Sequence, residues 1–336
     1  MKFPFPFSAI VGQEEMKQAI ILTAIDPSIG GVLVFGDRGT GKSTAVRGLA
    51  SLLPKIKILK GCPYNCNEFS KSCPHCGNKK PSKFIEKETP VIDLPLGSSE
   101  DRVVGALDLE AALVEGKKVF EPGLLAKANK GFLYIDEVNL LEDHIVDLLL
   151  DAAASGENLV EREGLSIKHE AKFVLVGSGN PEEGELRPQL LDRFGLSVEV
   201  SSPQDISERV EVIKRRDAYE TDYAKFIKKW RREDSKTRKK ILLARELVKK
   251  NKLEGQVLED CAKLCLALGA DGLRGELTLL RAARSMAAYE GEIITTHNHV
   301  KKVALSALRH RLRRDPLDEA GSSTRVMKII NEVFEQ

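Results

Sequence analysis

A short segment at residues 36–43, GDRGTGKS, has the residue types and the spacing that bind phosphate. Its glycines let the backbone curl tightly and turn successive N–H groups inward, which makes a cradle for a β-phosphate at the positive end of the following helix. The lysine ammonium can reach the β- and γ-phosphates, and the serine hydroxyl can coordinate Mg²⁺. An apolar strand before the segment and helix-forming sequence after it favour a nucleotide site over a chance glycine-rich turn. We therefore assign nucleotide binding to Gly36, Asp37, Arg38, Gly39, Thr40, Gly41, Lys42, Ser43 and Thr44, with Ser43 also a ligand of the metal.

An acidic pair follows an apolar run at residues 131–137, GFLYIDE. The apolar residues predict a buried strand that delivers Asp136 and Glu137 to its carboxyl end. There Asp136 would hold Mg²⁺, usually through water, and Glu137 would polarise the attacking water. Such a pair alone is often only a helix cap. Together with the phosphate-binding segment it indicates a nucleotide hydrolase, whose catalysis comes mostly from positioning and charge stabilisation.

Size and composition fit an enzyme of two domains. At 336 residues the chain exceeds one ordinary domain, and its 42% hydrophobic content is enough for real cores. The net charge is +2, no apolar run approaches the roughly 20 residues that cross a bilayer, and the start lacks the order of a signal peptide. We therefore expect a cytoplasmic protein without membrane contact. In a reducing compartment its six cysteines are better interpreted as ligands, redox groups or core residues than as a disulfide framework.

Apolar strands and amphipathic helices alternate along the chain down to about residue 200. The strand candidates are Gly31–Phe35, Val91–Leu94, Phe132–Ile135, Phe173–Ser178 and an edge strand at Ser197–Val200. This alternation predicts an α/β fold, with a parallel sheet between helices and the nucleotide at the carboxyl ends of the strands. Residues 155–172 interrupt the order with alternating residues around a turn at Gly164, which predicts a β-hairpin that projects from the sheet.

The character of the chain changes after Pro203. Residues 204–253 are dense in Lys, Arg and Glu at helical spacing, and the sequence beyond them is helical with almost no strand signal. The basic run around Trp230 could contact nucleic acid, but its interspersed acidic residues favour a solvated helix face. We therefore expect an α/β nucleotide-binding domain at 1–202, a charged long-helix linker at 203–253 and a smaller all-α domain at 254–336.

Four of the cysteines, in the segment GCPYNCNEFSKSCPHCGN, have the spacing of metal ligands. The pairs C-x3-C and C-x2-C on two turns can surround one tetrahedral Zn²⁺, and the neighbouring prolines and glycine suit such tight knuckles. A thioredoxin-responsive dithiol, an iron–sulfur cluster and unliganded thiols are the alternatives. His75 is not expected to be a ligand, and Cys261 and Cys265, one helical turn apart among apolar residues, are expected in the core. The zinc interpretation assigns Cys62, Cys66, Cys73 and Cys76, within an insertion at 61–80, to a structural site.

Several longer stretches resemble one group of AAA+ ATPases. They are PFSAIVGQEEMKQAIILTAIDPSIGGVLVFGDRGTGKSTAVR, LPLGSSEDRVVGALD, EPGLLAKANKGFLYIDEVNLL, NPEEGELRPQLLDRFG and HRLRRDPLDEAGSS. Over nearly its whole length the chain resembles the I-subunit family of magnesium chelatase, the ATPase that drives metal insertion into protoporphyrin. The resemblance implies ATP and Mg²⁺ as cofactors and a ring of identical subunits, a hexamer, with active sites at subunit interfaces. It also implies partners like the D and H subunits of that family, and no direct contact with nucleic acid.

The resemblance assigns three more residues to hydrolysis. Asn180 matches the sensor-1 residue that orients the lytic water. Arg193, in LLDRFG, matches the arginine finger, which enters the site of the neighbouring subunit, and Arg274, in GLRGE, matches the sensor-2 arginine of the helical lid. Without the resemblance, Asn180 would be interpreted as a turn residue. Arg193 would then be a partner of the adjacent Asp192, and Arg274 a surface partner of Glu276 or Asp271.

The resemblance also bears on the role of the whole chain. The segments 94–123 and 155–172 match the two insertions of the family and imply output surfaces toward the pore or a partner. The expected role is that of a motor that does not itself hold the porphyrin, since no His/Glu constellation for a macrocycle is present and aromatic content is only 5%. Mg²⁺ and Co²⁺ are both open as the inserted metal. A MoxR-like AAA+ remodelling chaperone for a metalloprotein is the alternative. A nucleic-acid motor is a third, which the near-neutral net charge disfavours.

Overall fold

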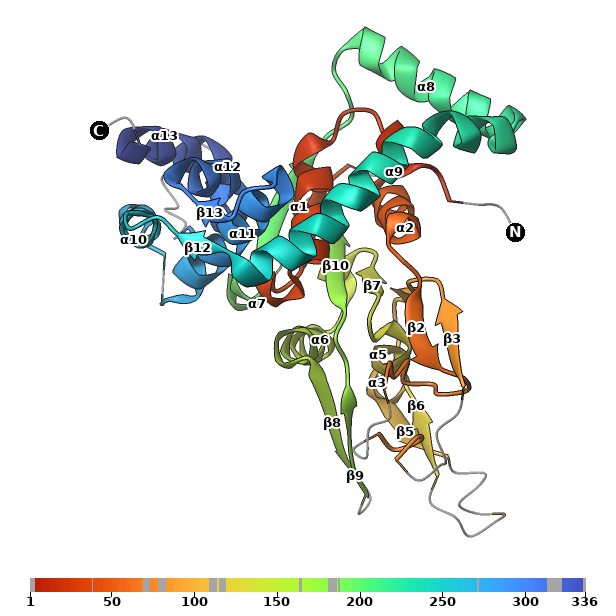
Figure 1. Ribbon diagram of the computed structural model, residues 1–336. Coiled ribbons are helices and arrows are strands. Elements are labelled where there is room, and N and C mark those ends of the chain that lie inside the picture. Colours follow the sequence, from red (N-terminus) through yellow and green to blue (C-terminus); the bar gives the residue numbers. More distant parts are fainter. Residues whose placement is uncertain are drawn as a thin grey trace.

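A five-stranded parallel sheet forms the centre of the first part of the chain (Figure 1). The computed structural model describes residues 4–37, 39–68, 73–77, 83–108, 114, 119–162, 165–180, 186, 188–270, 272–312 and 322–334. The strands, in the order β11-β1-β10-β7-β4, are β1 (Val32–Gly36), β4 (Val91–Leu94), β7 (Phe132–Ile135), β10 (Val174–Gly179) and β11 (Leu196–Val200). Neighbouring strands all pair in parallel. The five expected strands are therefore confirmed, including β11 at an edge.

Helices cover both faces of this sheet. Val32 and Val34 of β1 belong to a hydrophobic cluster with α1 (Glu14–Ile25) and α2 (Lys42–Leu52). Leu33 belongs to the cluster on the opposite face, with α3 (Glu100–Val104), α5 (Leu124–Ala128), α6 (Asp143–Ser155) and α7 (Pro188–Arg193). The strands are nearly continuous apolar runs because both faces of the sheet are buried. This arrangement confirms the predicted α/β architecture.

Three antiparallel hairpins extend from one end of the sheet, toward the bottom of Figure 1. One is the hairpin expected within 155–172, made of β8 (Glu157–Arg162) and β9 (Leu165–Glu170). The other two were not predicted from the sequence. Strand β3, FIEK, is exposed at every residue, so it lacks the apolar alternation that marks a half-buried strand. These two hairpins pair β2 (Ile56–Leu59) with β3 (Phe84–Lys87), and β5 (Gly105–Leu107) with β6 (Phe120–Pro122).

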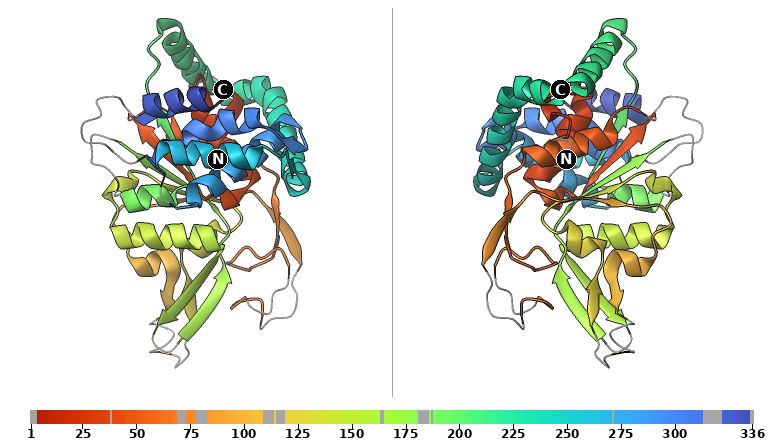
Figure 2. Two further views of the ribbon diagram at one scale, coloured as in Figure 1. Left: turned by 90° about the vertical axis from the view of Figure 1, so that its left-hand side faces the viewer. Right: turned by 90° about the vertical axis from the view of Figure 1, so that its right-hand side faces the viewer.

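Two long charged helices, α8 (Ile206–Thr221) and α9 (Tyr223–Leu247), follow the sheet. Helix α9 packs over α1, where Arg245 donates hydrogen bonds of 2.7 and 3.0 Å to the carbonyl oxygen of Ala24. Helix α8 stands out from the body, and both views of Figure 2 place it at the end opposite the β8–β9 hairpin. Trp230 of α9 is half-buried, with the Arg215 guanidinium 4.7 Å from its ring centre. The tryptophan of the basic run therefore packs the two helices together, which favours the solvated-face interpretation.

A helical domain ends the chain. Its described residues contain one strand pairing, two residues long, between β12 (Lys252–Leu253) and β13 (Ile294–Thr295). Cys261 and Cys265 are buried in its core, as expected. No helix in the described ranges combines the length and the apolar character needed to span a membrane. The helices are α10 (Val257–Leu268), α11 (Arg274–Glu290), α12 (His297–Leu308) and α13 (Ser322–Phe334), and short 3-10 turns elsewhere are η1 (Phe7–Ala9), η2 (Pro27–Ile29), η3 (Val138–Leu140) and η5 (Val248–Lys250).

The residues that follow α12 fix this domain to the sheet. The buried Arg311 guanidinium donates hydrogen bonds to the carbonyl oxygens of Phe194 (2.7 Å) and Gly195 (3.1 Å), and to the Asp192 carboxylate (3.2 Å). Burial lowers the pKa of Arg311 to about 10, while Asp192 opposes the shift, so the guanidinium stays charged at neutral pH. Arg309 forms a second ion pair, with Glu15 of α1. These contacts give Arg309 and Arg311 a docking role.

Candidate active site

A cavity of about 450 Å³ opens at the carboxyl ends of β1, β7 and β10. Parallel strands end at one edge of a sheet, so residues distant in sequence meet there. Two residues assigned from the sequence lie beside the cavity instead: Gly36 ends β1, and Asp37 accepts a long hydrogen bond (3.4 Å) from the Ser202 N–H. Arg38 lies outside the described residues. The predicted site residues that line the cavity are Gly39, Thr40, Gly41, Lys42, Ser43, Thr44, Asp136, Glu137 and Asn180.

The glycines of the loop are required for two different reasons. Gly39 and Gly41 have φ angles of +77° and +85°, a region that side chains with a Cβ rarely adopt, although open space surrounds both positions. Gly36 is limited by packing as well, because a Cβ there would lie 1.7 Å from the carbonyl oxygen of Val200 on β11. The loop can therefore keep its backbone N–H groups turned toward a phosphate. A larger residue at Gly39 or Gly41 would strain the backbone, and one at Gly36 would push β1 away from β11.

Lys42 begins α2 and already points along the loop. Its ammonium donates hydrogen bonds to the carbonyl oxygens of Gly36 (2.7 Å) and Gly179 (3.4 Å). Burial lowers the pKa of Lys42, and the carboxylates of Asp136, Asp37 and Glu137 act in the opposite direction. An anion entering the cavity would favour the charged form further, so the lysine is suited to bind phosphate.

A polar clamp that the sequence did not reveal holds the acidic pair. Ser178 Oγ lies 2.5 Å from Asp136 Oδ1, and the Tyr134 hydroxyl lies 3.2 Å from the same oxygen. Burial raises the pKa of Tyr134 to about 12, so this hydroxyl keeps its proton and donates it. Both donors come from strands, β7 and β10, and fix one carboxylate oxygen while the other stays available for a metal ligand or water. A polar residue at the end of an otherwise apolar strand was the available sequence signal for Ser178.

Glu137 and Asn180 complete the cavity. Glu137 adopts φ +54° and ψ +56°, a left-handed conformation that is uncommon for a residue with a side chain, and its N–H donates to Ser178 Oγ at 3.3 Å. Unusual backbone conformations of this kind are concentrated at functional sites, because the surrounding structure must hold them in place. Asn180 follows β10 directly and is 7% exposed. Both residues line the cavity together with the loop.

The two arginines assigned from the family resemblance are held elsewhere. Arg193, at the end of α7, pairs with Asp151 (2.7 Å) and Asp147 (3.0 Å) of α6 instead of the adjacent Asp192. Arg274, at the start of α11, pairs with Asp192 at 2.9 Å. Neither arginine is among the described residues that line the phosphate cavity. Within one chain, therefore, the structure brings together the loop, the acidic pair and Asn180, and leaves both arginines on a different surface.

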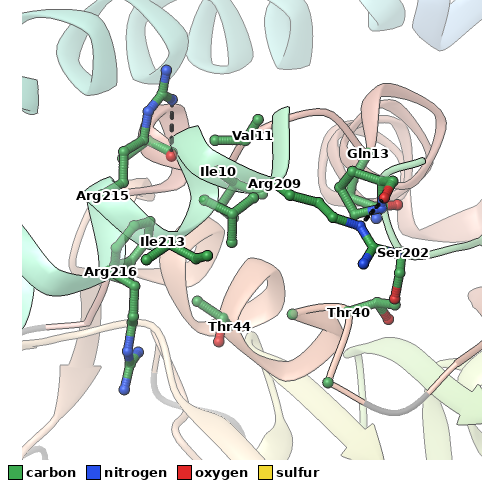
Figure 3. A pocket seen from close by; sticks show the side chains of 16 residues that line it. Ile10, Val11, Gln13, Thr40, Thr44, Ser202, Arg209, Ile213, Arg215 and Arg216 are labelled. Atoms are coloured by element: carbon green, nitrogen blue, oxygen red, sulfur yellow. Dashed lines mark hydrogen bonds between the residues drawn. The ribbon is translucent and has the colours of Figure 1, made fainter. Parts of the chain in front are cut away.

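A second, mostly apolar cavity of about 570 Å³ adjoins the first (Figure 3). Ile10 and Val11 form part of its wall, and Thr40 and Thr44 of the loop line both cavities. A nucleotide whose phosphates occupy the first cavity has room for its base in the second. The sequence does not reveal this pocket, because its walls come from three segments far apart in the chain, within residues 5–13, 39–44 and 202–216.

The four cysteines of the 61–80 segment meet in one buried cluster. Their sulfur atoms all lie within 4.8 Å of one another, and the Cys62 and Cys73 sulfurs are 3.9 Å apart. Sulfur ligands about 2.3 Å from one tetrahedral zinc would be separated by about 3.8 Å, so the spacing fits this ion. Hydrogen bonding to Cys66 lowers the pKa of Cys62, which favours a thiolate in the cluster. The Cys76 N–H points at Cys73 Sγ (3.4 Å), as expected of a metal-binding knuckle.

Family profiles and similar proteins indicate the family to which this chain belongs. A family profile described as "Magnesium chelatase, subunit ChlI" matches residues 106–189, and a profile of the AAA lid domain matches residues 258–332. The magnesium-chelatase 38 kDa subunit of Cereibacter sphaeroides is 68% identical over 334 residues, which cover 99% of this chain and 100% of that protein. The chain belongs to the I-subunit family of magnesium chelatase. A ChlI homolog from Methanocaldococcus jannaschii is 50% identical, with 100% of this chain and 93% of that protein covered.

Solved structures agree with this family. A chain in the cryo-electron-microscopy complex of subunits BchI and BchD of magnesium chelatase is 60% identical, with a TM-score of 0.58, and the match covers 96% of this chain and 99% of that one. A candidate ATPase from Cytophaga hutchinsonii has a TM-score of 0.66 at 18% identity, over 98% and 91% of the two chains, and supports the fold alone. The AAA+ fold is thereby confirmed, and the I-subunit family is favoured over a MoxR-like chaperone or a nucleic-acid motor.

Proposed function

We propose that this chain is the ATP-hydrolysing motor subunit of a magnesium chelatase. The observation that carries the proposal is the phosphate cavity, in which the loop, the acidic pair and Asn180 meet in a member of the I-subunit family. ATP would lie with its β- and γ-phosphates against the loop N–H groups and the Lys42 ammonium. Ser43 and Asp136 would hold Mg²⁺, whose charge would neutralise the phosphate oxygens. The clamp on Asp136 supports this role, because it presents one carboxylate oxygen in a fixed direction.

The side chains of the cavity would move the proton and supply part of the stabilising charge in hydrolysis. Glu137 would accept a proton from the attacking water, and Asn180 would orient that water. Lys42 would offset the charge that develops on the γ-phosphate. Since these groups act by position, small displacements of Asp136 or Glu137 should lower the rate far more than they lower nucleotide affinity.

We further propose that the subunits form a ring, a hexamer, in which Arg193 serves the ATP site of the neighbouring subunit and Arg274 assists nucleotide binding from the lid. Arg193 lies on the α6 and α7 face of the sheet, whereas α2 and the loop belong to the other face. Its partners Asp147 and Asp151 have side chains 47% and 73% exposed, so these ion pairs are weak enough to exchange for a phosphate. Both features support a role between subunits.

The proposed partners are a D-type and an H-type chelatase subunit. The BchI–BchD complex, to which this chain is similar, supports the first. The segments 94–123 and 155–172 are the proposed contact surfaces, because their hairpins project from the same end of the sheet (Figure 1). We propose that the chain divides into an α/β domain at 1–202, a charged linker at 203–253 and a lid at 254–336.

The cysteine cluster is proposed to hold one structural Zn²⁺. Hydrogen bonds tie its segment to helix α5 and the residue after it: Asn129 Nδ2 donates to the Tyr64 carbonyl (2.7 Å), and Asn65 Nδ2 donates to the Lys127 carbonyl (3.0 Å). The double variant Cys73→Ser/Cys76→Ser should lose about one zinc per chain in elemental analysis, whereas Cys261→Ser, a buried cysteine outside the cluster, should keep it. Zinc contents below about 0.2 per chain in the unaltered protein would favour the redox-active dithiol instead.

Metal insertion tests the main proposal. The chain would be mixed with D-type and H-type subunits, protoporphyrin, Mg²⁺ and ATP, and the product would be followed by its absorption. We expect insertion with ATP, none without it, and none with Lys42→Ala. Insertion at the full rate with Lys42→Ala would refute the motor role of this site, and ATP hydrolysis without any effect on insertion would favour a different output.

A further inference from the structure

The turn that follows Arg193 is fixed to the sheet. Arg193 ends α7, and Phe194 and Gly195 are the two residues between it and β11. Phe194 is fully buried on the face of the sheet that α6 and α7 cover. Gly195 packs so closely that a Cβ there would lie 2.1 Å from the Ile29 carbonyl oxygen. The Arg193 side chain, which is 33% exposed, thus projects from a backbone that is anchored directly after it.

One side chain of the helical domain contacts the backbone on both sides of Arg193. It is Arg311, which follows α12 and is only 2% exposed. The Asp192 carbonyl belongs to the last turn of α7, where a helix leaves its final C=O groups without partners inside the helix. The carbonyl oxygens that accept hydrogen bonds from the guanidinium belong to Asp192 (2.9 Å), Phe194 (2.7 Å) and Gly195 (3.1 Å).

The Asp192 carboxylate is engaged by the helical domain as well. Its Oδ1 accepts a hydrogen bond from Arg311 Nε (3.2 Å), and its Oδ2 accepts one from Arg274 (2.9 Å). Arg193 therefore pairs with two exposed carboxylates of α6 instead of its neighbour in sequence. An arginine held by Asp192 would be fixed against its own subunit, whereas exposed ion pairs are weak enough to exchange for another anion.

These contacts require a guanidinium and not only a positive charge. An arginine presents its N–H donors in a fixed planar fork, so Arg311 can use Nε and both terminal nitrogens on different acceptors. A lysine has all its donors on one nitrogen and cannot reach acceptors on both sides of Arg193 together. The fork is itself held in place, because Arg311 Nη1 also donates to the Ala307 carbonyl of α12 at 2.6 Å.

We propose that Arg311 is a positioning residue for Arg193: it fixes the backbone around that residue and occupies Asp192, so that the Arg193 side chain is left for the neighbouring subunit. This inference rests on the proposed role of Arg193 between subunits. Arg311 is not among the described residues that line the phosphate cavity, so it would act on hydrolysis through Arg193 alone.

Hydrolysis by Arg311→Lys tests the inference. Because a displacement of about 1 Å can cost about 100-fold in rate, kcat should fall about 100-fold. The Kd of ADP, measured by calorimetry, should stay within roughly twofold of the wild type, because the nucleotide's own loop is intact. Arg309→Lys is the matched control, since Arg309 is 4% exposed and also joins the helical domain to the α/β domain, through Glu15. Its kcat should stay within about threefold of the wild type.

Two further measurements separate positioning from a loss of stability. The double variant Arg193→Ala/Arg311→Lys should have the same kcat as Arg193→Ala, because two residues that act through one contact do not have additive effects. Rings that mix Arg311→Lys with Lys42→Ala should recover part of the hydrolysis. In some of their interfaces, the intact loop of an Arg311→Lys subunit meets the correctly placed Arg193 of a Lys42→Ala subunit.

Several outcomes would overturn the inference. They are wild-type kcat in Arg311→Lys, an equal loss in Arg309→Lys, additive losses in the double variant, and no recovery in mixed rings that are shown to form. Arg311→Gln, which keeps an N–H donor pair without the charge, is a second variant. If neither variant folds, Arg311 serves the fold and the inference is wrong.

The proposed function is tested separately from the inference. Full hydrolysis in Lys42→Ala would refute the ATP site itself. Full hydrolysis in Arg193→Ala would refute the role of Arg193, and the inference with it. A loss of hydrolysis in Arg193→Ala together with wild-type kcat in Arg311→Lys would leave the proposed function standing and remove only the role of Arg311.

Discussion

Arg193→Ala is expected to remove most ATP hydrolysis while leaving the fold almost unchanged. The Arg193 guanidinium lies 2.7 Å from Asp151 and 3.0 Å from Asp147, but its own side chain is 33% exposed and theirs are 73% and 47% exposed. Ion pairs with this much solvent contribute about 0.2–1 kcal/mol each. The free energy of unfolding should therefore fall by roughly 1–2 kcal/mol at most. An arginine finger that meets developing charge on a phosphate contributes about 10³–10⁵ in kcat. A finger and a mere surface partner of α6 therefore predict values of kcat for Arg193→Ala that differ by orders of magnitude.

The assay compares hydrolysis, binding and stability in the same variant. Arg193→Ala should bind ADP almost normally and melt close to the wild type, yet lose at least about 10³ in kcat. Arg47→Ala is the matched control, because Arg47 pairs with Asp93 at 2.6 Å and both side chains are about half exposed. Its kcat should stay within about twofold of the wild type.

Mixing experiments decide whether Arg193 acts between subunits. Rings of Arg193→Ala and Lys42→Ala subunits contain some interfaces where an intact loop meets an intact finger, so part of the activity should return. If mixed rings form and no mixing ratio restores hydrolysis, the role between subunits is wrong. A drop in kcat no larger than that of Arg47→Ala would show that Arg193 is only a surface partner of α6.

Three further outcomes are expected. Lys42→Ala should abolish productive ATP binding, whereas Glu137→Gln should bind ATP and Mg²⁺ and turn over very slowly, because the lysine meets ground-state phosphates and the glutamate is needed for the chemical step; normal turnover in Glu137→Gln would contradict the assignment. Ser178→Ala removes the closest donor to Asp136 and should lower kcat about tenfold, with a smaller change in the Kd of ADP, which calorimetry would reveal. Burial lowers the pKa of His169, so as the pH falls below about 6.5 the imidazole binds a proton in the unfolded chain before it does so in the folded protein. The free energy of unfolding should therefore fall with pH in this range, and this dependence should be shallower in His169→Gln. An unchanged dependence on pH in His169→Gln would contradict the role assigned to His169.

Much of the central sheet and part of the site could be predicted from local sequence. Apolar runs predict β1, β7 and β10, because a strand that is buried on both faces consists of consecutive apolar residues. The phosphate loop is local too, since Gly39, Gly41 and Lys42 act within one turn between a strand and a helix. Once parallel strands are expected, the meeting of Asp136 with the loop follows from their shared carboxyl edge. Motifs that each span a few residues therefore predict the residues of the proposed hydrolysis site.

The rest depended on contacts between segments far apart in the chain. Ser178 approaches Asp136 only because β10 lies beside β7. The spacing of the two residues in the sequence does not predict this contact. The exposed strand β3 has no periodic pattern, so its pairing with β2 is set by the partner strand. Arg193 has an acidic neighbour in sequence, yet it pairs with α6. Adjacent residues of a helix point about 100° apart, and Asp192 pairs instead with Arg274 and Arg311. The sequence by itself determined the phosphate-binding loop, the acidic pair and the strands that carry them, because these features are local. The tertiary structure decided which residues meet at the cavity and which charges pair with one another, because long-range packing and not local propensity sets those positions.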